Sequence, residues 1–194
     1  KGHNDVEIID LPGIYSLSPY TLEEVVSRNY LLNEKPDVMI NIVDSSNIER
    51  LLYLTTQLLE TGVPMILALN MTDIVKKRGD IINIKALSKR LGCEVIETAA
   101  VKSEGCAELA EKAIALGKSS QKPKPLLIFS NDITETLSKI ESIIKAKSTT
   151  EHPDFYAIKL FERDEKAIEQ LKLADTVMAE ITALTASCEE AMDD

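Results

Sequence analysis

The sequence predicts an α/β domain, with a parallel sheet covered by helices on both faces, followed by a small all-α domain. Up to residue 117, apolar runs of strand length alternate with amphipathic helical patterns. Strands that are apolar throughout are buried on both faces, as in parallel sheets. Beyond a polar connector the strand pattern stops. We therefore expect a sheet domain over 1–117, a linker over 118–125 and a helical domain over 126–194.

The strands are expected where short apolar runs occur. Right-handed crossovers between them place their carboxyl ends along one edge of the sheet, where such sheets bind ligands. Residues that follow each run are therefore the candidate site residues. The four runs are Val6–Ile9, Val38–Val43, Pro64–Leu69 and Glu94–Glu97.

Helices are expected between these runs. Thr21 with Glu24, and Ser46 with Glu49, have the spacing of a capping box, in which each partner satisfies a free backbone N–H of the first turn. Glycine just after an apolar pattern favours a helix end. The expected helices run from Thr21 to Leu32, from Ser46 to Gly62, over Ile84–Leu91 closed by Gly92, and over Ala107–Leu116 closed by Gly117.

The second domain has no strand pattern. The connector before it is polar and contains two prolines, which is typical of a linker. After it, Ile133, Leu137, Ile140 and Ile144 recur at helical spacing. The expected helices are Ile133–Ala146, Pro153–Phe161, Glu165–Leu173 and Thr176–Met192.

Composition excludes several classes of function. The formal net charge of −10 argues against a nucleic-acid partner, which requires a basic surface. No apolar run reaches the roughly 18 residues that span a bilayer. The cysteines, Cys93, Cys106 and Cys188, lack zinc-site spacing and suggest free thiols in a reducing compartment. His3 and His152 have no partner that would indicate a metal site.

The first candidate motif is Asp10-Leu11-Pro12-Gly13, which follows the first expected strand. A carboxylate at a strand end can hold the water shell of Mg²⁺. A glycine three residues later lets a backbone N–H approach a phosphate oxygen closely. Taken alone, this D-x-x-G pattern is common.

The second motif is Asn70-Met71-Thr72-Asp73, which follows the third expected strand. An aspartate can accept hydrogen bonds from N1–H and the exocyclic amine of guanine, and the Asn three residues earlier can brace the loop. After the fourth strand, the small residues of Thr98-Ala99-Ala100 leave backbone N–H groups free to meet the guanine carbonyl oxygen. The order of the motifs, 60 residues from 10 to 70 and then 28 from 70 to 98, predicts one guanine-nucleotide site.

The stretch from Asp10 to Thr21 is more specific. Together with Asn70–Asp73, it resembles the cytoplasmic G domain of the bacterial ferrous iron transport protein B family, within the translation-factor-like branch of small GTPases. The resemblance is close from Val6 to Leu116, and the part after Lys118 fits that family's helical spacer more loosely. It implies a P-loop-NTPase-like (Ras-like) sheet that binds GTP or GDP with Mg²⁺. It also implies a permease domain in the same polypeptide, at the cytoplasmic face of the bacterial inner membrane.

The resemblance assigns roles to the site residues. Asp10 would hold Mg²⁺ through water, and the Gly13 N–H would sense the γ-phosphate. Asp73 would select guanine with Asn70 as its support, and Met71 would cover the base where many GTPases have a lysine. The implied nucleotide-binding set is Asp10, Leu11, Pro12, Gly13, Asn70, Met71, Thr72, Asp73, Thr98, Ala99 and Ala100.

Hydrolysis is expected to be slow. Ile14 follows the D-x-x-G motif where Ras-like proteins have a glutamine that positions water, and an aliphatic side chain cannot do this. The resemblance also makes Ile14 to Tyr20 the second switch, a loop that responds to the γ-phosphate. We name no catalytic residue in this chain.

One motif that the resemblance requires is not in the sequence. The phosphate-binding pattern G-x-x-x-x-G-K-[ST] does not occur: Gly117-Lys118-Ser119 imitates its end, but Lys112 stands in place of the first glycine. We therefore expect a fragment that lacks the phosphate loop and the first switch and binds nucleotide poorly. The full-length protein would bind and slowly hydrolyse GTP.

Two alternatives stay open on sequence alone. A soluble GTPase of ribosome assembly or tRNA modification shares the motifs, although such proteins usually carry a basic extension and the tail here is acidic. A degenerate G domain that serves only as an interaction module is the other. The sequence does not decide whether the protein forms homo-oligomers.

Overall fold

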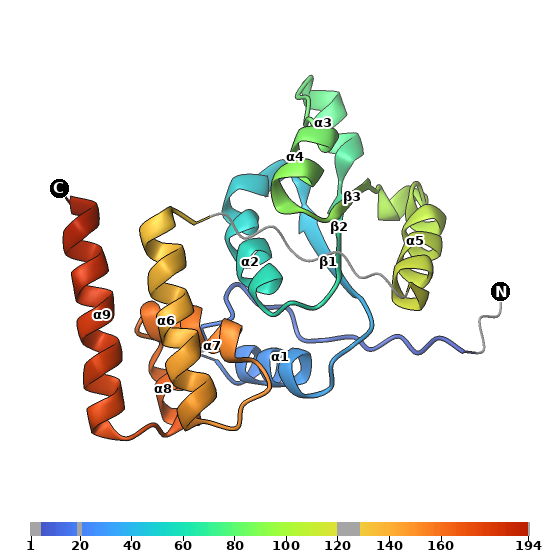
Figure 1. Cartoon of the computed structure of the whole chain (residues 1–194). Helices are drawn as coiled ribbons and strands as arrows, with labels where there is room; N and C mark the ends of the chain where they lie inside the picture. Colours follow the sequence, from blue (N-terminus) through green and yellow to red (C-terminus); the bar gives the residue numbers. More distant parts are fainter. Residues whose placement is uncertain (1–4, 19–20, 120–128, 194) are drawn as a thin grey trace. The chain divides into compact units, whose positions relative to one another are not determined.

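The computed structural model describes residues 5–18, 21–119 and 129–193. The chain divides into two compact units, Lys1–Leu127 and Ile128–Asp194 (Figure 1). Most of the expected linker, residues 120–125, lies outside the described residues. Each unit is considered by itself.

The first unit contains a parallel sheet, as expected from its apolar runs. Met39 pairs with Met65, and Ile66 pairs with Glu94, so the middle strand is hydrogen-bonded on both sides. Among the described residues the sheet has three strands in sequential order. They are β1 (Met39–Asp44), β2 (Met65–Asn70) and β3 (Glu94–Glu97).

The first expected strand, Val6–Ile9, is wrong. This segment is not paired into the sheet, and the Ile8 side chain is 89% exposed. A strand needs a neighbour to bond its N–H and C=O groups, and an apolar run alone does not provide one. Among the described residues β1 is an edge strand, whose side chains Ile40 and Ile42 are 40% and 67% exposed.

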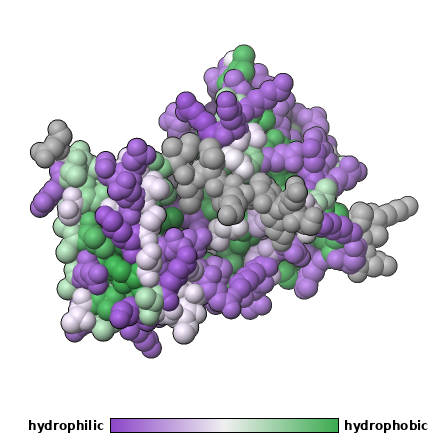
Figure 2. All heavy atoms as spheres, in the orientation of Figure 1, coloured by the Kyte–Doolittle hydropathy of each residue, from purple (hydrophilic) through white to green (hydrophobic). Residues whose placement is uncertain are grey.

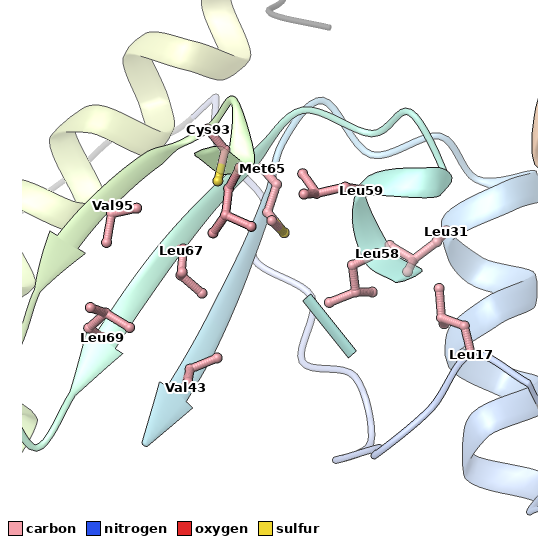
Figure 3. Packing of buried hydrophobic residues seen from close by; sticks show 11 residues of the cluster. Leu17, Leu31, Val43, Leu58, Leu59, Met65, Leu67, Leu69, Cys93 and Val95 are labelled. Carbon is pink, nitrogen blue, oxygen red and sulfur yellow. The ribbon is translucent and has the colours of Figure 1, made fainter. Parts of the chain in front are cut away.

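Helices cover both faces of the sheet, because successive strand residues point to opposite sides. Leu67 faces a core formed with Leu31 of α1 and Leu58 of α2 (Figure 3). Ile66, one residue earlier, packs instead with Ala113 of α5. The helices are α1 (Leu22–Asn33), α2 (Ile48–Glu60), α3 (Thr72–Arg78), α4 (Ile84–Leu91) and α5 (Cys106–Lys118).

One of the two expected capping boxes forms. Thr21 accepts from the N–H of Glu24 at 3.3 Å, and the Glu24 carboxylate accepts from the Thr21 N–H at 3.1 Å. The box at Ser46 is wrong: its N–H and hydroxyl both donate to Oδ1 of Asp44, at 2.8 and 2.7 Å. Asp44 thereby caps a 3₁₀ turn, Ser45–Asn47, that precedes α2.

The glycine signals were partly correct. Gly62 and Gly92 have φ of 72° and 67°, in the left-handed region that favours glycine after a helix. Gly117 lies inside α5, which continues to Lys118 and ends in an extended Ser119, so this expected stop was wrong. The short helix α3 was not predicted from the sequence.

The second unit contains the four expected helices. Their hydrophobic side chains meet in a core centred on Ile140, Ile144, Ala157, Leu160 and Ile181. The helical spacing of the isoleucines thus predicted the buried face correctly. The helices are α6 (Asn131–Lys147), α7 (Pro153–Phe161), α8 (Glu165–Leu171) and α9 (Asp175–Asp193).

A shallow groove of about 590 Å³ lies between α6 and α9. Ile143 and Leu184 contribute apolar surface to it, and Ser138 and Glu180 contribute polar surface. Hydrophobic side chains show in this region of the surface (Figure 2). In the part of the chain that the structure describes, no helix has the length and hydrophobicity needed to span a bilayer.

Candidate functional site

Asn70, the last residue of β2, connects the ends of two strands. Its side-chain Oδ1 accepts from the N–H of Ala100 at 3.0 Å and from the hydroxyl of Thr98 at 3.3 Å. Both partners follow β3, so the amide fixes the β3 loop against β2. The bracing role expected for Asn70 therefore has a direct structural basis.

Thr72 adds to this connection. Its hydroxyl and its N–H both donate to the carbonyl oxygen of Thr98, at 3.1 and 3.2 Å, and the Thr98 N–H donates to the carbonyl of Leu69 at 2.7 Å. On the other side, the Ser45 hydroxyl donates to the Asn70 carbonyl at 2.5 Å. Hydrogen bonds therefore join the carboxyl ends of all three strands.

Met71 turns the chain from β2 into α3. Its φ of 63° is left-handed, which costs a non-glycine residue roughly 1–2 kcal/mol. The turn places Asp73 in the first turn of α3, and it leaves the Met71 side chain 40% exposed. The sequence therefore has an exposed thioether two residues before a carboxylate at this end of the sheet.

The Asp73 carboxylate is ionised. Oδ2 lies 2.8 Å from Nζ of Lys102, and the two side chains are 25% and 46% exposed. The hydrogen bond and the charge of Lys102 lower the pKa of Asp73, with a smaller effect from Lys77. At neutral pH this group is therefore a pure acceptor.

The loop after β3 is folded back on itself. The Ala99 N–H donates to the carbonyl of Glu104 at 3.0 Å, and the Glu104 N–H donates to the carbonyl of Ala99 at 3.3 Å. A short 3₁₀ turn, Ala100–Lys102, lies between them, and the Val101 side chain is fully exposed. In this arrangement the N–H groups of Ala99 and Ala100 both have acceptors within the protein.

Gly105 ends this loop at a position that no other residue fits. Its φ is 75°, and a Cβ there would lie 2.1 Å from the carbonyl oxygen of Glu97. We expect Gly105→Ala to destabilise the protein by about 3 kcal/mol or more, because a backbone clash is added to the left-handed strain. Urea unfolding monitored by circular dichroism measures this.

Gly79 is the matched control for that substitution. It has φ of 81°, but no atom from a non-neighbouring part of the chain lies within 4 Å of the place that a Cβ would take. Gly79→Ala should therefore lower the free energy of unfolding only by the strain of a left-handed backbone, about 1 kcal/mol. Equal losses for the two variants would show that the contact with Glu97 is unimportant.

The D-x-x-G segment is not connected to this cluster. Asp10 is exposed and makes no hydrogen bond or ion pair within the described residues. Pro12 accepts a weak hydrogen bond from the Ser27 hydroxyl at 3.4 Å, and Leu11 packs against the core. Gly13 has ordinary φ and open space where a Cβ would lie, so the fold itself does not require glycine there.

The loop that follows is anchored by buried polar side chains. Leu17 is fully buried, its N–H donates to Gln57 Oε1 at 2.8 Å, and its carbonyl accepts from Arg28 at 3.3 Å. In the same loop, the centre of the Tyr15 ring lies 5.3 Å from the guanidinium carbon of Arg50. This loop is the expected second switch, of which Pro19 and Tyr20 lie outside the described residues.

No cluster of three or more His, Cys, Asp and Glu side chains occurs among the described residues. Mg²⁺ does not require one, since it commonly binds through one or two carboxylates, phosphate oxygens and water. The exposed Asp10 carboxylate fits that chemistry.

Several residues of this region were not predicted from the sequence. No local pattern indicates contacts between residues that lie 11 to 40 positions apart in the chain. Such contacts join Lys102 to Asp73, and Gln57 and Arg28 to Leu17. Val101 could have been noticed as an apolar residue in a polar loop. The Gly105 turn had a weak signal, a glycine just before a helical pattern.

The family comparison matches both units. The model described as "Ferrous iron transport protein B" matches residues 1–113. A second, described as "FeoB cytosolic helical domain", matches residues 129–194. Together the two matches reproduce the division of the chain into two units.

Two curated relatives illustrate the similarity. The "Fe(2+) transport protein A/Fe(2+) transporter FeoB fusion protein" of Porphyromonas gingivalis is 44% identical over 136 residues, which is 69% of this chain and 16% of the relative. "Fe(2+) transporter FeoB" of Escherichia coli K12 is 49% identical over 106 residues, 53% of this chain and 14% of the relative. The chain therefore spans about one sixth of these relatives or less.

Solved structures resemble the whole chain. Three NFeoB structures from S. thermophilus are 39% identical and cover 95% of it: one bound to mGMPPNP (TM-score 0.84), a point mutant bound to GDP (0.88), and one bound to GDP.AlF4- and K+ (0.85). This chain covers 70–72% of those chains. At this identity and TM-score, the fold of the first unit is that of a Ras-like G domain.

Proposed function

This chain belongs to the ferrous iron transport protein B family, and on that premise we propose that it is the GTP-binding regulatory part of a ferrous iron transporter. In the full-length protein it binds GTP and hydrolyses it slowly. Two sets of contacts at the strand ends carry this proposal. Asn70 bonds Thr98 and Ala100 and so braces the loop after β3, and Asp73, an ionised carboxylate, pairs with Lys102 of the same loop.

The base would bind at these strand ends. The two carboxylate oxygens of Asp73 accept from N1–H and the exocyclic amine of guanine, and adenine has no such pair of donors. The guanine carbonyl oxygen would take a backbone N–H of Ala99 or Ala100. Both groups have acceptors within the protein, Glu104 and the Asn70 side chain, so the base would share or displace one of these hydrogen bonds. Exposed Met71 and Val101 provide apolar surface for the base.

The phosphates and Mg²⁺ would lie near the D-x-x-G segment. Asp10 is the carboxylate for the metal's water shell, and Gly13 leaves room for its N–H to reach the γ-phosphate. Ile14 packs against the core and offers no group that orients water, so hydrolysis is slow. Bound Mg²⁺ supplies charge neutralisation of the phosphates.

The remaining phosphate contacts would come from outside these 194 residues. The sequence contains no G-x-x-x-x-G-K-[ST], and it covers about 70% of the solved NFeoB chains. Within the described residues, the outer edge of β1 has no strand beside it. That edge, with exposed Ile40 and Ile42, has the backbone groups that a further parallel strand needs. We place the phosphate loop and the first switch in an N-terminal segment of the full-length protein.

The membrane and transport roles extend this proposal. The relatives are named as Fe(2+) transporters, and we propose that a permease domain of the same polypeptide holds this part at the cytoplasmic face of the cell membrane. The nucleotide state would act on that permease. We see no observation that favours the ribosome-assembly or interaction-module alternatives.

Nucleotide selectivity tests the proposal. We expect the full-length protein to bind GDP at least about 100-fold more tightly than ADP, because adenine would leave the ionised Asp73 without donors. Isothermal titration calorimetry with both nucleotides and Mg²⁺ measures this. Equal affinities, or no GDP binding, would contradict the proposed function.

A further inference from the structure

Lys102 occupies one of the two oxygens that guanine would need. Its ammonium lies 2.8 Å from Oδ2 of Asp73. A bidentate hydrogen bond to a base edge requires both carboxylate oxygens in the plane of the base. The ammonium takes one of the lone pairs of Oδ2 and partly neutralises the carboxylate, so it weakens the hydrogen bonds that the two donors of guanine can make there.

The loop geometry holds Lys102 in this place. Its backbone N–H donates to the carbonyl of Ala99 at 2.8 Å, and Ala99 is bridged to Glu104 on the far side of the turn. Ser103 then takes a left-handed φ of 59°. These contacts fix the backbone of Lys102 within the turn, and its side chain reaches Asp73 of α3 while it stays 46% exposed.

We propose that Lys102 is a positioning residue that competes with guanine for the carboxylate of Asp73, so that nucleotide binding must displace it. This inference rests on the proposed function. It predicts that removal of the ammonium increases affinity for guanine nucleotides, which is the opposite of the effect expected for a lysine that contacts the nucleotide. The partly exposed pair is weak, as such pairs are, so a base can displace it.

Lys102→Met in the full-length protein tests the competition. Methionine keeps the apolar stem and removes the charge. We expect the GDP dissociation constant to fall by about two- to fivefold, as the loss of an exposed ion pair allows. Because the substitution acts where the base binds, the GTP dissociation constant should fall by the same factor.

Lys112→Met is the matched control. Lys112 of α5 pairs with Glu94 and is equally 46% exposed, so the variant has the same net charge without a change near Asp73. Its GDP affinity should match the wild type. In about 1 M NaCl, charges are screened within about 3 Å. The ratio of the GDP dissociation constants of wild type and Lys102→Met should then approach one.

The outcomes separate this inference from the proposed function. An equal or higher GDP dissociation constant for Lys102→Met, relative to both wild type and Lys112→Met, overturns the competition while the wild-type GDP affinity still supports the function. A gain that does not change with salt also overturns it, since repacking of the loop would then explain the effect. Wild-type protein that binds no GDP overturns both.

Discussion

Asp73→Asn is expected to weaken GDP binding by about 10²–10⁴-fold, since each hydrogen bond to a charged group contributes about 1.5–3 kcal/mol. The amide keeps one acceptor for N1–H but turns a donor towards the exocyclic amine of guanine. Calorimetry on the full-length protein measures the loss. Stability should change little, because the only ion pair that Asp73 makes among the described residues, with Lys102, is partly exposed.

Asp80→Asn is the control for that variant. Asp80 lies just past the other end of α3 and is exposed, so the substitution removes the same charge away from the strand ends. It should leave the GDP affinity unchanged. A tenfold or smaller loss for Asp73→Asn, or equal losses for the two variants, would mean that Asp73 does not read the base.

The 194-residue polypeptide is expected to bind GDP at least about 100-fold more weakly than the full-length protein. It contains the groups proposed to read the base, but not the backbone N–H groups and the lysine of G-x-x-x-x-G-K-[ST], and each lost charge-assisted hydrogen bond costs about 1.5–3 kcal/mol. Calorimetry on both proteins measures the difference, and a far-UV spectrum with a cooperative unfolding transition shows that the polypeptide is folded. Micromolar GDP affinity for the folded polypeptide would refute this expectation.

The fold could largely be predicted because its signals are local. The apolar runs at Val38–Val43, Pro64–Leu69 and Glu94–Glu97 gave all three strands of the described sheet, and Thr21 with Glu24 gave the start of α1. Val6–Ile9 failed because a strand requires a hydrogen-bonded neighbour, which composition does not reveal.

Smaller errors have the same origin. Ser46 has capping-box spacing, but Asp44 competes for its N–H and hydroxyl and forms a 3₁₀ turn first. Gly117 after an apolar pattern predicts a helix end, yet α5 continues to Lys118. The short α3 was missed because Met71 enters it through a left-handed turn, for which the sequence has no glycine or asparagine signal.

The candidate site could be predicted only in part. The residue types at the ends of β2 and β3 indicated Asn70 and Asp73, and the structure places Asn70 in contact with the Thr98–Ala100 loop. Lys102 was not predicted, because its contact with Asp73 depends on how a turn 29 residues later is folded. Gln57 was missed for the same reason: it bonds a loop 40 residues earlier.

The anchoring of Leu17 limits how the loop after D-x-x-G can move. Gln57 and Arg28 bond its N–H and carbonyl, and its side chain is part of the core. A response to the γ-phosphate would therefore involve residues before Leu17 most easily. Displacement of Leu17 itself would disturb both α1 and α2.

If the carboxylate of Asp73 recognises guanine, Asp73→Asn should change which base the protein prefers. Xanthine has a carbonyl in place of the exocyclic amine, so the asparagine amide can donate to it while its oxygen still accepts from N1–H. Competition between GDP and xanthosine diphosphate (XDP) should favour GDP in the wild type and XDP in the full-length variant. If the variant loses affinity for GDP without gaining affinity for XDP, or still prefers GDP, the base is recognised by other residues.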